Sequence, residues 1–175
     1  MRLLNARTYE LVERYDGVLE YAILSHTWGD AKDEVSFRDI QPETLQRARG
    51  KPGFAKISFA AEQAVHDGLE YVWVDTCCID KSSSAELSEA INSMYRWYQE
   101  ASVCYVYLAD LWAGSNFEQR FGHSRWFTRA WTLQELIAPM SVHFFDQDWL
   151  YLGNRRDMHA PVSYTHLTLP TKRIV

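Results

Sequence analysis

Short hydrophobic runs alternate along the chain with segments whose apolar residues recur at helical spacing. The apolar runs have the length of buried β-strands and cover residues 21–24, 69–74, 103–108 and 142–145. The helical segments between them cover residues 57–65, 83–98 and 126–138. Alternating strands and helices predict right-handed crossovers and a mainly parallel sheet. We therefore expect an α/β fold of the flavodoxin-like type, with a strand order near 2-1-3-4-5.

Local signals place the ends of these helices. Asp67 and Gly68 follow the first helical segment and supply its stop. In the second, Ser83 is followed three residues later by Glu86, which is the spacing of a capping box. Pro139 ends the third helical segment, because proline cannot continue a helix. Residues 30–53 are polar and predict a long loop with a helical turn at 42–49.

Three sequence blocks combine an apolar run with polar residues at its end or on one helical face. They read YAILSHTWGD at 21–30, YVWVDTCCIDK at 71–81 and SRWFTRAWTLQELIAP at 124–139. In open parallel sheets, ligands bind beyond the carboxyl ends of the strands. SHTWGD, DTCCIDK and Asp110 are all expected at that rim, so the sequence predicts a binding site there.

The three blocks, in this order and with the helix of residues 83–98 between the second and third, resemble the heterokaryon incompatibility (HET) domain of filamentous fungi. The resemblance covers roughly residues 21–153 and implies a HET domain at 1–158, incomplete at its C-terminal end, with a TIR-like fold. It further implies allorecognition, a form of innate immunity in which the domain induces programmed cell death. Its implied partners are other copies of the chain on activation and sensor or NLR-type proteins.

The motif W-x-x-x-E-L at 131–136 resembles the corresponding helix of TIR domains, whose first strand also ends in a serine-containing loop, as at Ser25. In catalytically active TIR domains, the glutamate of this helix is essential for cleaving the nicotinamide–ribose bond of NAD. The resemblance therefore implies that Glu135 is the catalytic residue of an NAD glycohydrolase. NAD would be its substrate, and we expect no bound cofactor.

The residue chemistry is compatible with this hypothesis. Trp131 and Glu135 are four residues apart on a helix, so an indole lies beside the carboxylate and offers a stacking surface. A carboxylate can stabilise the oxocarbenium-like centre that forms when a glycosidic bond breaks. Asp75, Asp80 or Asp110 could supply a second carboxylate, although nicotinamide leaves as a neutral molecule and needs none.

Each of these interpretations has a structural alternative. Glu135 could instead pair with Arg125 or Arg129 and serve packing, and the domain would then be a non-enzymatic module acting by self-association and partner recruitment. Ser25, His26, Trp28, Asp75 and Trp131 are candidate nucleotide contacts. Alternatively, Ser25 and His26 bond the loop backbone while Trp28 fills the edge of the core. No GxGxxG or GKS/T motif supports a Rossmann or P-loop site.

Other chemistries find less support in the residue pattern. Cys77 and Cys78 with His26 suggest a cysteine nucleophile, but buried cysteine more often behaves as a small hydrophobic residue. Asp75 and Asp80 lack the loop pattern of a calcium site, so we expect no metal and a cap or a salt bridge to Lys81 instead.

Composition and charge limit the possible partners and cellular compartment of the protein. A net charge of −5 without a Lys/Arg run disfavours nucleic acid as a partner. No apolar stretch approaches the roughly 20 residues of a membrane span. Three cysteines, an odd number, suit a reducing compartment, and we expect a cytoplasmic protein. Residues 161–175 break the pattern and are expected to be a non-native tail.

Overall fold

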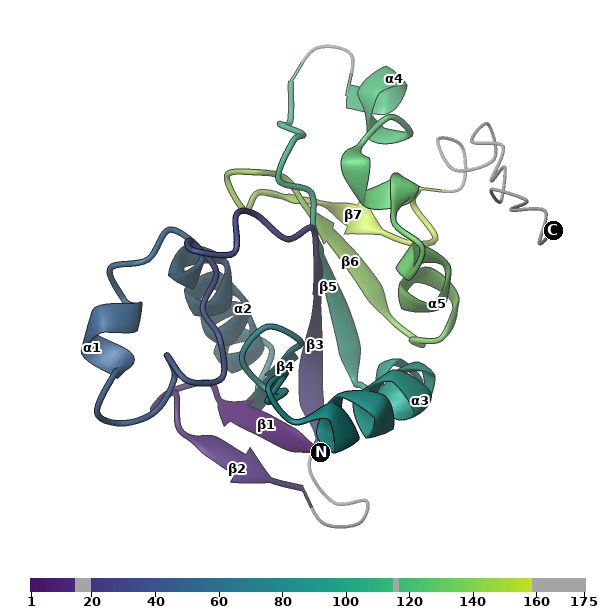
Figure 1. Ribbon diagram of the computed structural model, residues 1–175. Coiled ribbons are helices and arrows are strands. Elements are labelled where there is room, and N and C mark those ends of the chain that lie inside the picture. The colour runs from purple at the N-terminus through teal and green to yellow at the C-terminus, as the bar shows by residue number, and fades with distance from the viewer. Residues whose placement is uncertain (15–19, 115–116, 159–175) are drawn as a thin grey trace, which may run out of the picture.

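A computed structural model describes residues 1–14, 20–114 and 117–158, so the tail expected at 161–175 lies outside the described residues. The described residues form one mixed sheet in the order β2-β1-β4-β3-β5-β6-β7 (Figure 1). Its centre consists of four parallel strands, which are β3 (Tyr21–His26), β4 (Tyr71–Val74), β5 (Val103–Tyr107) and β6 (Val142–Phe145). The α/β class is confirmed, and these four strands have the expected order 2-1-3-4.

Antiparallel strands complete both edges of the sheet. The hairpin of β1 (Arg2–Asn5) and β2 (Leu11–Glu13) pairs with β4, and β7 (Tyr151–Asn154) pairs with β6. None of the three is evident from the hydrophobic pattern, because none is a continuous apolar run like those of the central strands. Burial of Leu3 and Leu4 nevertheless ties the hairpin to the core.

Helices cover both faces of the sheet. The helical elements are α1 (Leu45–Ala48), α2 (Phe54–His66), α3 (Ser84–Glu100), α4 (Phe117–Phe121), the 3-10 helix η1 (Arg125–Thr128) and α5 (Thr132–Ile137). Helix α2 lies on one side of the sheet, and α3 and α5 lie on the other (Figure 1). The chain changes sides because it steps from β3 to β4 in one direction and then returns past β3 to β5.

The core lies between these layers. All six residues of β3 are buried, as expected for a central strand covered on both faces. The largest fully buried side chains include Tyr21, Trp73, Trp126 and Phe144. Each such side chain stabilises the fold by about 1.5–3 kcal/mol relative to an exposed position.

The predicted C-terminal end of α2 and N-terminal cap of α3 are confirmed. Asp67 is the C-cap of α2, and Gly68 follows it with a φ of 80°, a conformation that glycine adopts without strain. Ser83 caps α3, and its Oγ accepts a hydrogen bond from the Glu86 backbone N–H at 3.3 Å. The Glu86 side chain does not return the bond but accepts from the Asp80 backbone N–H at 2.8 Å.

The prediction of one continuous helix over 126–138 is wrong. The chain forms η1, leaves helical geometry at Arg129 and resumes as α5 at Thr132. Hydroxyl groups explain the break: Thr128 donates to the Arg125 carbonyl and Thr132 to the Trp126 carbonyl, which are acceptors a regular helix uses itself. Trp131 is consequently the N-cap residue of α5, and its carbonyl still accepts from the Glu135 N–H at 3.2 Å.

None of the helices in the described ranges is long and apolar enough to cross a membrane.

Candidate functional site

A cavity of about 480 Å³ lies beyond the carboxyl ends of β3 and β4, against α3 and α5. This volume is within the range of small-molecule sites. Ile79, Leu87, Ile91, Met94 and Tyr98 form an apolar wall, and Thr27, Trp28, Asp75, Lys81, Arg129, Ala130, Trp131 and Glu135 complete the lining. The cavity therefore brings together four of the candidate residues from three distant parts of the chain.

Glu135 belongs to a chain of hydrogen bonds that begins at the buried Trp126. Ser25 Oγ donates to Glu135 Oε2 at 2.6 Å, and Trp126 Nε1 donates to Ser25 Oγ at 2.7 Å. Arg129 donates to both carboxylate oxygens, at 2.8 and 3.0 Å. Because Glu135 is only 2% exposed, this bidentate pair offsets the cost of burying its charge.

The pairing decides between the two predicted arginine partners. Arg129 forms the ion pair with Glu135, whereas Arg125 Nε lies 3.7 Å from Asp110 Oδ2. Glu135 thus has both a structural ion pair and a place in the cavity wall. In this conformation both carboxylate oxygens of Glu135 are paired.

Asp75 is the second carboxylate of the cavity. His26 Nε2 lies 2.9 Å from its Oδ1, and Trp28 Nε1 donates to its Oδ2 at 2.8 Å. Burial opposes ionisation of Asp75, but the bonds to His26 and Trp28 and the charge of Lys81 outweigh it and lower the pKa of the carboxyl. Asp75 is therefore an anion held at a fixed orientation.

Two tryptophans form the accessible rim. Trp28 is 53% exposed and Trp131 is 42% exposed. Trp28 therefore does not fill the edge of the core, because its N–H is anchored on Asp75 while its ring faces outward. Lys81 Nζ lies 3.8 Å from the centre of that ring. Flat rings beside two cations and two carboxylates suit a ligand with aromatic, hydroxyl and anionic groups.

Ser25 and His26 occupy a layer beneath the cavity. Each is 1% exposed, and neither lines the cavity wall. Ser25 orients Glu135, and His26 orients Asp75. The structure therefore places these two candidates where they position carboxylates.

Sequence reasoning missed the apolar wall of the cavity. Leu87, Ile91 and Met94 fit the periodic stripe of α3, and periodicity cannot distinguish a residue packed in a core from one facing a cavity. Arg129 and Lys81 were foreseen only as ion-pair partners. Their position beside two carboxylates depends on the break between η1 and α5 and on the loop after β4.

A clamp beside the cavity holds the loop that carries Trp28. Glu34 Oε1 accepts from the Gly29 N–H at 2.6 Å and from Lys56 Nζ at 2.5 Å. Burial lowers the pKa of Lys56, and the Glu34 carboxylate opposes that effect. This paired lysine fixes the start of the long loop against α2.

The remaining candidates lie outside the cavity lining. Asp80 accepts from Ser82, and Asp110 accepts from Ser124 Oγ at 2.6 Å and the Arg125 N–H at 2.8 Å. Both carboxylates therefore stabilise local turns. Within the described ranges, no group of three His, Cys, Asp or Glu side chains could hold a metal ion.

The cysteine environment does not support a nucleophile. Cys77, Cys78 and Cys104 are free and buried. The neighbouring Cys78 thiol and burial raise the pKa of the Cys77 thiol, which disfavours the reactive thiolate. His26, the proposed base, has its Nε2 directed at Asp75.

Comparison with known proteins places this arrangement in a family. Residues 21–117 match the model of the family described as Heterokaryon incompatibility protein (HET). The chain is also 51% identical over 149 residues to "Vegetative incompatibility protein HET-E-1" of Podospora anserina, an alignment that covers 81% of this chain and 11% of that protein. The chain thus spans about a tenth of the length of this relative. No solved structure matches the chain. The family match over more than half of the chain and the identity to this relative establish that the chain belongs to the HET family.

Proposed function

We propose that this HET domain is an effector of fungal non-self recognition that induces cell death by cleaving the nicotinamide–ribose bond of NAD when it assembles. Family membership and the name of the Podospora relative support the incompatibility role. The observation that carries the chemistry is the position of Glu135 in the wall of a cavity that Trp28 and Trp131 border. The proposal includes that the domain is related in fold to TIR domains.

In this proposal, different cavity residues bind different groups of NAD. The rings of Trp28 and Trp131 offer stacking surfaces for the nicotinamide and adenine groups. Lys81 and Arg129 supply positive charge for the two phosphates. Asp75 is a fixed acceptor for ribose hydroxyl groups.

Hydrolysis of the nicotinamide–ribose bond needs few catalytic groups from the protein. Water adds to the anomeric carbon, the bond to the nicotinamide nitrogen breaks, and nicotinamide leaves as a neutral molecule with the bonding electron pair. The proton released from the water passes to solvent. Positive charge develops on the ribose in the transition state, and the Glu135 carboxylate stabilises it.

The described conformation is a resting state in this proposal. Both oxygens of Glu135 are occupied by Arg129, and Oε2 also accepts from Ser25. Catalysis requires Arg129 to turn from Glu135 toward the phosphates. Arg129 lies in the break between η1 and α5, where its backbone is extended and its N–H and carbonyl make only long hydrogen bonds of 3.4 Å, to Trp126 and Thr132. Assembly of several domains can therefore select the active arrangement.

The test is nicotinamide release by the purified domain, alone and fused to an oligomerising partner. We expect NAD cleavage from the oligomer only, and its loss in Glu135→Gln. Glu43→Gln is the matched control, because Glu43 is exposed and lies outside the cavity. Cleavage at the parental rate by a folded Glu135→Gln oligomer would reject the mechanism.

A second candidate function is a non-enzymatic module that acts by self-association. The observation in its favour is the complete pairing of Glu135, together with exposed apolar side chains on the neighbouring helices α3 and α5. These side chains are Ile91, Tyr95, Leu133 and Ile137. A second copy of the domain would cover them. Cell death with cellular NAD unchanged, abolished by Ile137→Asp and not by Leu150→Asp at another exposed site, would favour this function.

A further inference from the structure

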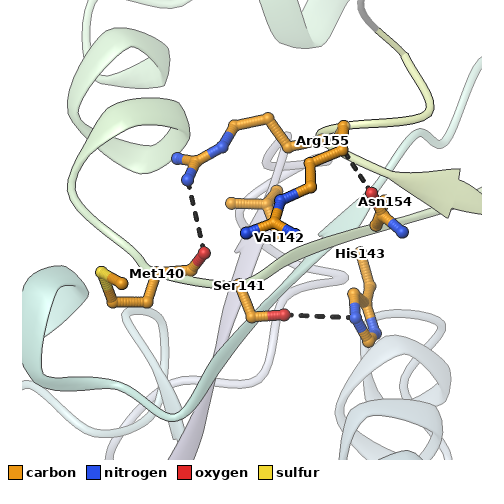
Figure 2. A pocket seen from close by; sticks show the side chains of 7 residues that line it. Met140, Ser141, Val142, His143, Asn154 and Arg155 are labelled. Carbon is orange, nitrogen blue, oxygen red and sulfur yellow. Dashed lines mark hydrogen bonds between the residues drawn. The ribbon is translucent and has the colours of Figure 1, made fainter.

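A second cavity, of about 330 Å³, lies at the amino-terminal end of β6 beside β7. Figure 2 shows its lining side chains, and Met140, Ser141, Val142, His143, Asn154, Arg155 and Arg156 contribute to it. The cavity at Glu135 lies beyond the carboxyl ends of the parallel strands, at the opposite edge of the sheet. The two cavities share no lining residue.

Hydrogen-bond donors converge on this second cavity. Ser141 Oγ and His143 Nε2 are 3.2 Å apart (Figure 2). With the hydrogen on Nε2, the hydroxyl accepts from His143 and is left to donate its own hydrogen outward. Asn154 Oδ1 accepts from the Arg156 backbone N–H at 2.8 Å and from that of Asp157 at 3.2 Å. These bonds fix the amide, so its Nδ2 group remains as a donor.

The two arginines have different roles. The Arg155 guanidinium donates to the carbonyls of Leu136, Pro139 and Met140, at 2.7, 3.1 and 3.3 Å. It therefore caps the end of α5 and is held in place by neutral acceptors, as Figure 2 shows for the bond to Met140. The Arg156 side chain is exposed, and no hydrogen bond joins it to the described residues.

Two carboxylates, Asp157 and Asp67, lie near lining residues of this cavity. Within the described ranges, neither Arg155 nor Arg156 has a carboxylate within ion-pair distance. Asp157 accepts from the Asn154 backbone N–H at 3.0 Å, and Asp67 accepts from the Tyr105 hydroxyl at 2.7 Å. A concave site with two guanidinium groups is thus present in a chain with a net charge of −5.

We propose that this cavity binds a phosphate group through Ser141, Asn154 and Arg156, with His143 orienting the Ser141 hydroxyl. A tetrahedral oxyanion presents several acceptor oxygens and matches converging hydroxyl, amide and guanidinium donors, with Arg156 able to bind two oxygens at once. Arg155 contributes its charge while its donors stay on the carbonyls. The volume accommodates the phosphate and a small part of the molecule that carries it.

The experiment measures binding of inorganic phosphate to the domain by calorimetry, at constant ionic strength against chloride. We expect saturable binding that Arg156→Gln weakens about tenfold or more, as for the loss of a hydrogen bond to a charged group. Arg47→Gln, in the exposed part of α1, removes the same charge elsewhere and should leave the affinity unchanged. Ser141→Ala should weaken binding severalfold, whereas Ser141→Thr should retain it.

Vesicles distinguish the two sources of a phosphate group. Binding to phosphatidylcholine vesicles that contain phosphatidic acid, lost in Arg156→Gln, assigns the group to a lipid headgroup. Saturable binding of soluble phosphate without vesicle binding assigns it to a free phosphate compound. Absence of binding in both arms, or equal binding by the parent and Arg156→Gln in both, overturns the proposal. None of these results depends on NAD cleavage, because the cavities are separate.

Discussion

Ser25 in β3 and Glu135 in α5 are 110 residues apart in sequence and are joined by a buried hydrogen bond of 2.6 Å. The same serine hydroxyl accepts from the indole N–H of Trp126. One small side chain in the central strand therefore connects the sheet to both η1 and α5. This connection determines where the Glu135 carboxylate lies in the cavity wall.

Replacing Ser25 by alanine tests this connection. The change leaves the buried Trp126 N–H without its acceptor and removes one donor to Glu135, so we expect a loss of about 1–3 kcal/mol in the free energy of unfolding. Chemical denaturation measures it. Ser88→Ala, at an exposed position of α3, should change stability by less than about 0.5 kcal/mol. Equal stability of the two variants would show that the Ser25 hydroxyl is not needed.

The clamp beside the cavity leads to a prediction at Gly53. A Cβ atom at this position would lie 2.5 Å from the Asp33 carbonyl oxygen and 3.0 Å from Glu34 Cα, and both are backbone atoms that cannot move freely. We expect Gly53→Ala to destabilise the domain by about 1–3 kcal/mol. At Gly50 the nearest atom would be 3.4 Å away, so Gly50→Ala should be tolerated. Thermal denaturation compares them, and equal melting temperatures would contradict the prediction.

The parallel centre of the sheet could be predicted because its strands are continuous apolar runs. The convergence of Asp75 and Trp28 followed from the rule that strand ends meet at one edge. Glu135 lies on α5, and only the resemblance to TIR domains made it a candidate. The N-terminal hairpin could not be predicted, because its place depends on long-range pairs such as Leu4 with Val72.

The partner of Glu135 was also beyond sequence reasoning. On a continuous helix neither Arg125 nor Arg129 would face Glu135, because neither lies three or four residues from it. Only the break after η1 brings Arg129 to the carboxylate. The break depends on the hydroxyl groups of Thr128 and Thr132, which bond backbone carbonyls that a regular helix would use. Hydrophobic periodicity gives no information on such bonds. Hydrophobic periodicity also does not predict the exposure of Ile91, because Ile91 falls in the same helical stripe as the buried Ala90 and Tyr98.

Asp75 predicts a dependence of stability on pH. Its pKa in the folded protein is lower than in the unfolded chain, where it is about 3.9. The carboxylate therefore contributes stability that is fully present above about pH 4 and is lost as the pH falls through the folded-state pKa. Melting temperatures of the parent should decrease more steeply below about pH 4 than those of Asp75→Asn. If the melting temperatures of the parent and Asp75→Asn fall equally steeply at acid pH, Asp75 does not contribute to this dependence.

The ion pair of Arg129 and Glu135 gives the most discriminating prediction. Glu135→Gln removes the charge that the half-buried Arg129 guanidinium faces and should lower stability. The double variant with Arg129→Gln removes both charges and should recover part of the loss. If Glu135 is catalytic, both variants lose NAD cleavage by about 100-fold or more, regardless of stability.

Arg129→Gln alone separates the two functions proposed for the domain. It frees the Glu135 carboxylate from its bidentate partner and leaves the Ser25 bond in place. If the ion pair maintains a resting state, this variant should cleave NAD without enforced oligomerisation, with a raised KM because a phosphate contact is lost. Nicotinamide release and KM are measured on protein that unfolds cooperatively. A folded Arg129→Gln variant that releases no nicotinamide, alone or oligomerised, while still causing cell death would leave self-association as the function of the domain.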